Sequence, residues 1–200
     1  MDGWHDEAES IVMAWYAGAR GGDAAASLLF GDANFSGRLP ITFARSDDDL
    51  PAFDNTSLTV SYAGLHGYQY ALEGQTEPLY PFGYGRSYTT FEWSLEEVTA
   101  DDEALRARVR VSNTGARAGV ETVQLYVAPP NGAPRALRAF AQREVMPGAS
   151  EEIDLVVPLR DLRVWTPSGW TLLEGDYTVY AAPDAHAAGS EVSLRLPGAP

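Results

Sequence analysis

The chain has no cysteine and no lysine, and it contains no long apolar run. Without cysteine it can form neither disulfides nor thiolate metal sites, and the usual sequence indicator of redox compartment is missing. No stretch approaches the roughly 20 apolar residues that a membrane-spanning helix needs. Residues 1–7 contain neither the basic nor the apolar segment of a signal peptide. We therefore expect a chain that is held together by packing alone and has no membrane partner.

The charge balance is strongly acidic. Fourteen arginines face 28 acidic residues, which gives a formal net charge of -14. Such a chain repels phosphate backbones and anionic lipid, so nucleic acid is also excluded as an expected partner. A length of 200 residues with 45% hydrophobic and 21% charged residues is typical of a soluble globular protein. This length suffices for one ordinary domain, or for a small domain plus part of another.

The C-terminal half shows the period of two that is typical of strands with one buried face. Apolar residues alternate with arginines or acids in several runs, of which the clearest are Leu105-Ala107-Val109-Val111, Val123-Leu125-Val127, Ile153-Leu155-Val157, Tyr177-Val179-Ala181 and Val192-Leu194-Leu196. Turn-forming residues such as Asn113-Thr114-Gly115 separate these runs. Six or seven strands at this spacing predict a fibronectin III-like (immunoglobulin-like) β-sandwich over residues 88–200. The fold class is therefore mostly β.

The first 50 residues predict a different, incomplete unit. Apolar spacing favours a helix over residues 6–16 and a second one from Ala24 to Phe30, capped by Asp23 and closed by Gly31. A short apolar strand is expected over 39–43. A helix–helix–strand unit of this kind has no sheet to cover, so we expect it to expose a contiguous apolar patch. Its members would be Ile11, Val12, Trp15, Leu28, Leu29 and Phe30.

Residues 51–87 have weak periodicity and are rich in tyrosine. Tyrosine and proline provide contact area with little conformational entropy to lose. We therefore expect an ordered linker, pinned between the flanking units by its aromatic residues. The tyrosines of the linker and its C-terminal border are Tyr62, Tyr68, Tyr70, Tyr80, Tyr84 and Tyr88.

No catalytic, cofactor-binding or metal-binding residue is predicted. Asp47, Asp48 and Asp49 are adjacent acids that favour a solvated turn or helix cap. Glu73 and Glu77 lie beside the tyrosines, where sugar binding and domain-junction packing are both consistent with the pattern. The histidines, which are His5, His66 and His186, lie far apart and lack acidic neighbours at metal-ligand spacing.

Two tryptophans flank a turn near a predicted sheet edge. Trp165 and Trp170 enclose Thr166-Pro167-Ser168-Gly169. An exposed pair of this kind can bind sugar rings, whereas a buried pair would contribute to core or interface packing. The sequence leaves both interpretations open.

Several motifs in the same order resemble family 3 glycoside hydrolases, the β-glucosidase and β-xylosidase type. They include Ala14-Trp15-Tyr16-Ala17-Gly18 with Gly21-Gly22, Leu29-Phe30-Gly31-Asp32 through Gly37-Arg38-Leu39-Pro40, Pro78–Phe91 and Val111–Val127. The run Pro78–Phe91 is similar to the family pattern PLFPFGYGLSYTTF almost residue for residue. Ala17 replaces the usual proline of the first motif.

This resemblance implies that residues 1–50 are the C-terminal end of the family's α/β-sandwich domain, followed by the linker 51–87 and the fibronectin III-like domain. It also implies that the aspartate nucleophile and the glutamate acid/base belong to earlier segments, so the chain alone should be inactive. The missing barrel and α/β portion would be its partner, with an oligo- or polysaccharide as a further one. The alternative is a stand-alone fibronectin III-like module that binds carbohydrate or protein.

Overall fold

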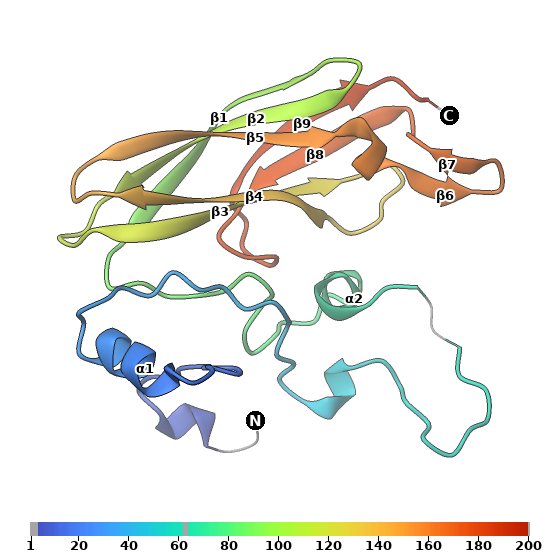
Figure 1. Cartoon of the computed structure of the whole chain (residues 1–200). Coiled ribbons are helices and arrows are strands. Elements are labelled where there is room, and N and C mark those ends of the chain that lie inside the picture. The colour runs from blue at the N-terminus through green and yellow to red at the C-terminus, as the bar shows by residue number, and fades with distance from the viewer. Residues whose placement is uncertain (1–3, 62–63, 200) are drawn as a thin grey trace.

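The alternating half of the chain forms two antiparallel sheets that pack face to face (Figure 1). The computed structural model describes residues 4–61 and 64–199. One sheet has the order β1-β2-β5, with strands Phe91–Ala100, Ala104–Asn113 and Ser150–Pro158. The other has the order β4-β3-β8-β9, with strands Ala136–Val145, Gly119–Ala128, Gly175–Ala181 and Ser190–Leu196. After β5 come a 3-10 turn, η3 (Leu159–Leu162), and a small hairpin of β6 (Val164–Thr166) and β7 (Gly169–Thr171).

The core lies between the two sheets and follows the predicted alternation. Leu105, Val109 and Val157 are fully buried, as are most inward residues of β3 and β8. On the outer face of β2, Arg108 pairs with Asp154 at 2.8 Å and Arg110 with Glu152 at 2.7 Å. Each acid on β5 stands directly opposite its arginine on β2. Cross-strand pairs of opposite charge stabilise a sheet. The mostly β sandwich fold expected from the sequence is confirmed.

Strand β9 departs from its predicted buried face. Leu196 is buried, but Val192 is exposed and Leu194 is only partly buried. β9 is an edge strand whose one ladder neighbour is β8. An edge position leaves a strand with fewer packing partners than a central one, so the alternation predicts more burial than the strand receives.

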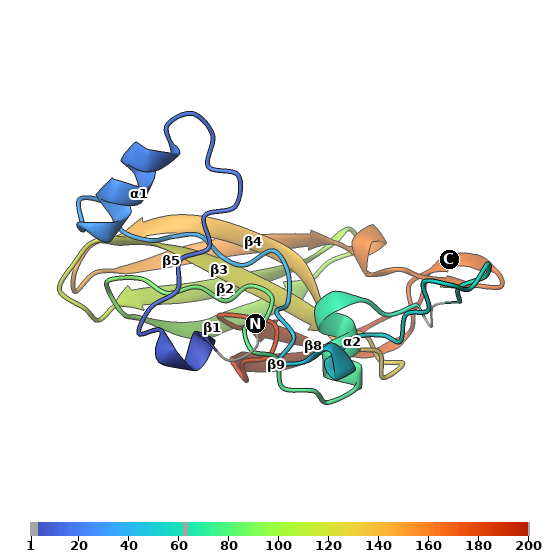
Figure 2. The ribbon, with the colours of Figure 1, turned by 90° about the horizontal axis from the view of Figure 1, so that it is seen from below.

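Strand β3 is buried on both faces. Val123, Leu125 and Val127 belong to the core of the sandwich, while Gln124 and Tyr126 point the opposite way and are buried as well. The cover on the second face comes from the N-terminal segments, which run across the four-stranded sheet (Figures 1 and 2). They carry helices α1 (Gly21–Leu29) and α2 (Gly67–Glu73) and the 3-10 turns η1 (His5–Glu7) and η2 (Asp47–Asp49).

The predicted helix over residues 6–16 is wrong. Only η1 forms there, and the chain then continues irregularly through Trp15, which has a φ of 46°. Val12 and Trp15 are exposed. Isolated short helices are marginal in water and depend on packing of an apolar face. Ala8 and Ile11 are only partly buried and Val12 and Trp15 are exposed, so this face is packed too little to hold a helix.

The second predicted helix forms with an earlier start. α1 begins at Gly21, and Asp23 lies in its first turn, where it pairs with Arg20 at 2.9 Å and does not cap the helix. The predicted end is confirmed, because Gly31 follows the C-cap Phe30 with a φ of 80°. This left-handed conformation is the one that favours glycine after a helix.

The predicted strand 39–43 is reduced to a single bridge between Phe43 and Tyr80. The segment pairs irregularly with residues 79–84: the Leu39 amide donates to the Tyr84 carbonyl at 2.8 Å, and the Gly83 amide donates to the Leu39 carbonyl at 2.8 Å. With no sheet beside it, the segment cannot build a ladder. In residues 4–61 and 64–199, no helix is long and apolar enough to cross a membrane.

The tyrosine-rich segment is held by its rings. Tyr68 stacks on Phe82 with centroids 4.6 Å apart, and Tyr80 lies 5.6 Å from Tyr84. Tyr68 also contacts Tyr126 of β3 edge to face. Tyr62 of the predicted run lies outside the described residues. The segment therefore bridges the N-terminal layer and the sandwich through aromatic packing.

Candidate functional site

The N-terminal segments meet the outer face of β3 at a polar seam. Gln124 donates from Nε2 to the carbonyls of Gly83 at 3.0 Å and Pro183 at 2.7 Å, and its Oε1 accepts from the Tyr126 hydroxyl at 2.8 Å. Burial raises the pKa of Tyr126, so this phenol stays a proton donor. Each buried polar atom of the amide thus has a partner, which is what makes a buried network stabilising.

A buried ion pair lies further along the same seam. Arg38 donates from Nη2 to Glu121 Oε1 at 2.5 Å, and the side chains are only 11% and 5% exposed. Glu121 also accepts the Thr122 amide at 2.9 Å. Burial raises the pKa of Glu121, and the Arg38 charge opposes that shift. Among the described residues, 4–61 and 64–199, Glu121 is the only buried acid. Its carboxylate is engaged in the ion pair with Arg38.

A third set of contacts fastens the start of the sandwich to the N-terminal layer. The Asn34 amide donates to the Ala118 carbonyl at 3.0 Å, and its Oδ1 accepts the Tyr88 amide at 2.8 Å. The Tyr88 hydroxyl donates to the Leu28 carbonyl at 2.7 Å, and Arg117 donates to the Gly31 carbonyl. The end of α1 is thereby tied to the sandwich at two points.

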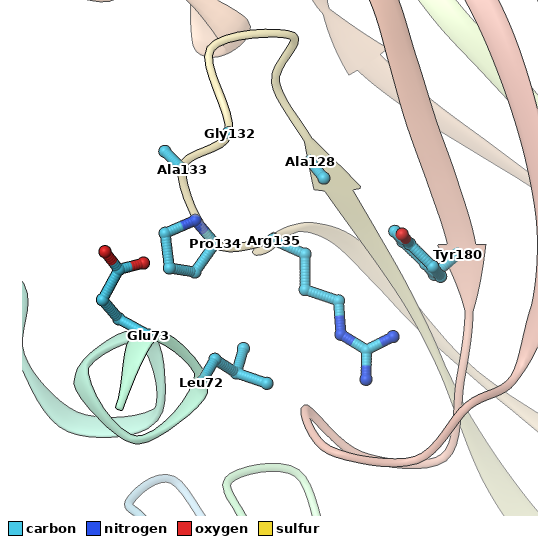
Figure 3. Close-up of a pocket in the computed structure, with 8 residues that line it drawn as sticks. All are labelled: Leu72, Glu73, Ala128, Gly132, Ala133, Pro134, Arg135 and Tyr180. Atoms are coloured by element: carbon cyan, nitrogen blue, oxygen red, sulfur yellow. The ribbon is translucent and has the colours of Figure 1, made fainter. Parts of the chain in front are cut away.

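An open groove of about 330 Å³ lies between α2 and the turn after β3 (Figure 3). It is lined by Leu72, Glu73, Ala128, Gly132, Ala133, Pro134, Arg135 and Tyr180. The guanidinium of Arg135 already has partners, because it donates to the carbonyls of Ala185 at 2.7 Å and Ala187 at 2.6 Å. It also lies 4.8 Å from the centre of the Tyr180 ring. Burial lowers the pKa of Arg135. Glu73 is the one carboxylate on the lining.

Two carboxyl groups about 5–5.5 Å apart are required for retaining glycoside hydrolysis. The groove offers one, so it lacks the pair that this chemistry needs. A second cavity, lined among others by Asp49, Tyr70 and Glu77, encloses about 50 Å³. Ligand pockets usually start at about 300 Å³, and this cavity is far smaller. Because Glu73 lines the groove and Glu77 lines this second cavity, the two carboxylates do not share one pocket.

The acidic run and the histidines occupy structural positions. Asp47–Asp49 form η2, in which Ser46 and Asp49 cap each other reciprocally, as a capping box does. His5 lies 3.2 Å from Asp6. The ring nitrogens of His186 are buried without a hydrogen-bond partner in the described part of the chain, and burial lowers the pKa of this imidazole. The described residues contain no cluster of three or more groups that could hold a metal ion.

The tryptophan pair is exposed. Trp165 on β6 and Trp170 on β7 stand directly opposite each other, with 70% and 61% of their surface exposed. Their rings are 5.7 Å apart and nearly perpendicular. Of the two interpretations that the sequence left open, core packing is therefore excluded in this chain.

The polar seam residues Arg38, Glu121 and Gln124 were missed by the sequence interpretation. The only available signal was that Glu121 and Gln124 interrupt the apolar run of β3, and an acid in a strand is ordinarily assigned to solvent.

The comparisons with known proteins agree with this architecture. Residues 1–88 match the glycosyl hydrolase family 3 C-terminal domain, and residues 121–185 match the fibronectin type III-like domain. The chain belongs to glycoside hydrolase family 3 and corresponds to the C-terminal region of its members. The chain is 36% identical to a probable beta-glucosidase I of Emericella nidulans, over 88% of this chain and 23% of that protein. It is 35% identical to a xylan 1,4-beta-xylosidase of Xylanibacter ruminicola, over 80% of this chain and 18% of that protein.

Solved structures of beta-glucosidases show the same fold. Beta-glucosidase 3B of Thermotoga neapolitana superposes with a TM-score of 0.91 at 35% identity, over 98% of this chain and 30% of that one. A beta-glucosidase of Kluyveromyces marxianus superposes with the same TM-score at 30% identity. The family 3 chain described here thus spans about a quarter of the length of the relatives that it matches.

Proposed function

We propose that this chain is the C-terminal structural part of a β-glucosidase-like, retaining family 3 glycoside hydrolase, and that it is inactive alone. In this account residues 1–50 end the α/β-sandwich domain, residues 51–87 are the linker and residues 88–200 are the fibronectin III-like domain. The observation that carries the proposal is the seam on β3, which joins an unfinished α/β layer to a complete sandwich. Its role is to brace that layer.

The exposed apolar surface of residues 12–30 supports the proposal that another segment normally covers it. Tyr16 is fully exposed and Phe30 is 86% exposed, and Val12, Met13, Trp15 and Leu29 are exposed as well. Exposed apolar patches of this kind mark sites of association. The partner proposed here is the barrel together with the earlier part of the α/β-sandwich domain, supplied in the same polypeptide or as a separate chain.

The proposed chemistry belongs to that partner. Retaining hydrolysis uses one carboxylate as nucleophile and one carboxylic acid as acid/base. The groove has Glu73 as its one carboxylate, and the cavity that is lined by Asp49 and Glu77 encloses only about 50 Å³. The buried Glu121 is held by Arg38. In this proposal the nucleophile and the acid/base belong to the missing N-terminal segments.

The direct test is a turnover assay of the isolated chain on aryl β-glucosides and β-xylosides, with a full-length family 3 β-glucosidase as positive control. We expect no release of the aryl alcohol above the uncatalysed rate. Turnover by the pure chain, lost on heating through its unfolding transition, would refute the proposal.

A stand-alone module that binds carbohydrate or protein is the second candidate. The exposed tryptophan pair favours it. The two candidates differ in what they need: a stand-alone module would bind its ligand without any second polypeptide, and it would gain no activity from one.

A further inference from the structure

The tryptophan hairpin, which consists of β6, β7 and the turn between them, projects from one end of the sandwich (Figure 1). Its turn is fixed by Thr166, whose hydroxyl donates to the Gly169 carbonyl at 3.0 Å and accepts the Ser168 amide at 3.2 Å. Its base is anchored by buried residues on both sides, Leu162 before β6 and Leu172 after β7. Leu172 also exchanges two backbone hydrogen bonds with Ala199, at 2.7 and 3.0 Å. The indoles are therefore presented by a fixed support.

The two rings form an open corner. Cross-strand neighbours share one face of a hairpin, and the angle of 75° between the ring planes turns one indole into a wall beside the other. A flat apolar face with a second wall suits the C–H face of a pyranose ring, because aromatic faces combine a large contact area with few rotatable bonds. The neighbouring Thr166, Ser168 and Thr171 are short hydroxyl residues and carry no charge.

The surroundings argue against a protein occupant. A stable protein interface buries about 800 Å² on each partner. The strands of the hairpin contribute only three residues each, and the large exposed apolar side chains among them are the two tryptophans. The hairpin also lies at the opposite end of the molecule from α1, whose apolar surface awaits the rest of the α/β layer (Figures 1 and 2). The hairpin is therefore separate from the apolar surface of residues 12–30.

We propose that Trp165 and Trp170 form a carbohydrate-binding site for a neutral polysaccharide such as a β-glucan or a xylan. This inference rests on the proposed function, because binding of a polysaccharide would serve an enzyme that hydrolyses glycosidic bonds. The net charge of -14 disfavours acidic polysaccharides. Since the corner takes one sugar ring, each contact is weak, and the many equivalent rings of a polymer provide a high concentration of binding positions for it.

Affinity electrophoresis of the full chain in native gels tests the site. The acidic chain migrates toward the anode, and soluble mixed-linkage β-glucan or arabinoxylan cast into the gel should retard it, whereas polygalacturonate should not. Trp165→Ala and Trp170→Ala should each weaken the apparent affinity at least about fivefold. Trp165→Phe, which keeps a ring, should lose less than Trp165→Ala.

Phe140→Ala is the matched control, because Phe140 on β4 is also an exposed aromatic residue but lies outside the hairpin. It should leave retardation unchanged. Thermal unfolding of every variant verifies folding. The proposal fails if neither neutral polymer retards the chain, if the double alanine variant is retarded like the unsubstituted chain, or if the tryptophans instead support self-association at rising protein concentration. None of these outcomes bears on turnover of small aryl glycosides, so the proposed function is judged separately.

Discussion

Gly83 lies at a close approach of the N-terminal layer and the sandwich. A Cβ at this position would lie 2.2 Å from Gln124 Oε1 and 2.8 Å from the Tyr126 hydroxyl, and the φ of 85° already disfavours other residues. We expect Gly83→Ala to lower the free energy of unfolding by about 2–4 kcal/mol, because it combines overpacking with left-handed strain. Urea unfolding followed by far-UV circular dichroism measures this change.

Gly132 supplies a matched control for that substitution. Its φ is 81°, close to that of Gly83, but nothing lies within 4 Å of a Cβ built there. Gly132→Ala should cost only the backbone strain, about 1 kcal/mol. Equal costs at the two positions would contradict the tight contact described for Gly83.

The ion pair between Arg38 and Glu121 makes a second prediction at the scale of residues. Removing one partner of a buried pair leaves an uncompensated charge, so Arg38→Ala should destabilise the protein by about 3–5 kcal/mol at pH 7. The combination of Arg38→Ala with Glu121→Gln should recover part of this loss. A loss at pH 7 below about 1 kcal/mol would contradict the buried geometry.

The pH dependence of that loss has a definite sign. Burial raises the pKa of Glu121 above its ordinary value of 4.5, and losing Arg38 removes the charge that opposes the shift. A folded-state pKa above the unfolded one means that the folded state holds the proton more tightly, so stability falls as the pH rises through the window above 4.5. The stability deficit of Arg38→Ala relative to the double variant should therefore shrink near pH 4. Chemical denaturation at pH 4 and 7 gives the comparison.

At the scale of elements, the sandwich was predictable from the sequence and the N-terminal layer was predictable only in part. From Leu105 in β2 and from Glu152 in β5, buried residues alternate with more exposed ones, because one face meets the core and the other meets water. The segment 6–16 carries helical periodicity, yet a helix of that length needs a surface to pack on, and Val12 and Trp15 of its apolar face remain exposed. Local pattern therefore fails where the partner lies elsewhere.

The candidate site was less accessible to prediction than the fold. The sequence singled out Trp165 and Trp170 but could not decide whether they are exposed, because exposure depends on where the hairpin projects. Gln124 and Glu121 gave no separate signal, since their burial arises only when residues 34–38 and 82–85 cover β3.

The uneven fastening of the N-terminal layer predicts an order of proteolysis. Residues 31–43 and 78–88 are held by the seam, while Trp15, Tyr16, Phe53 and Leu58 are exposed in irregular segments. We expect chymotrypsin to cut first at 15–16 and 53–58, because cleavage requires an exposed chain that can open locally. Mass spectrometry of the early fragments identifies the sites. First cleavage at Phe82 or Phe91 would contradict this arrangement.

At the scale of the whole molecule, three surfaces have different assignments. The β3 seam is internal and complete, the apolar surface of residues 12–30 is proposed to receive the rest of the α/β layer, and the tryptophan hairpin at the far end is proposed to bind polysaccharide. This distribution fits a part that braces and positions a larger hydrolase, with the chemistry carried by other segments.

The measurement that tests this account most directly is complementation. The chain would be mixed with a matching N-terminal portion that supplies the barrel and the earlier α/β segment, and release of the aryl alcohol from an aryl β-glucoside would be followed. We predict that neither part turns over alone and that the mixture does, with Phe30→Asp in the apolar surface of this chain reducing the recovered rate. Activity of the N-terminal portion that is unchanged by adding this chain would contradict the central claim.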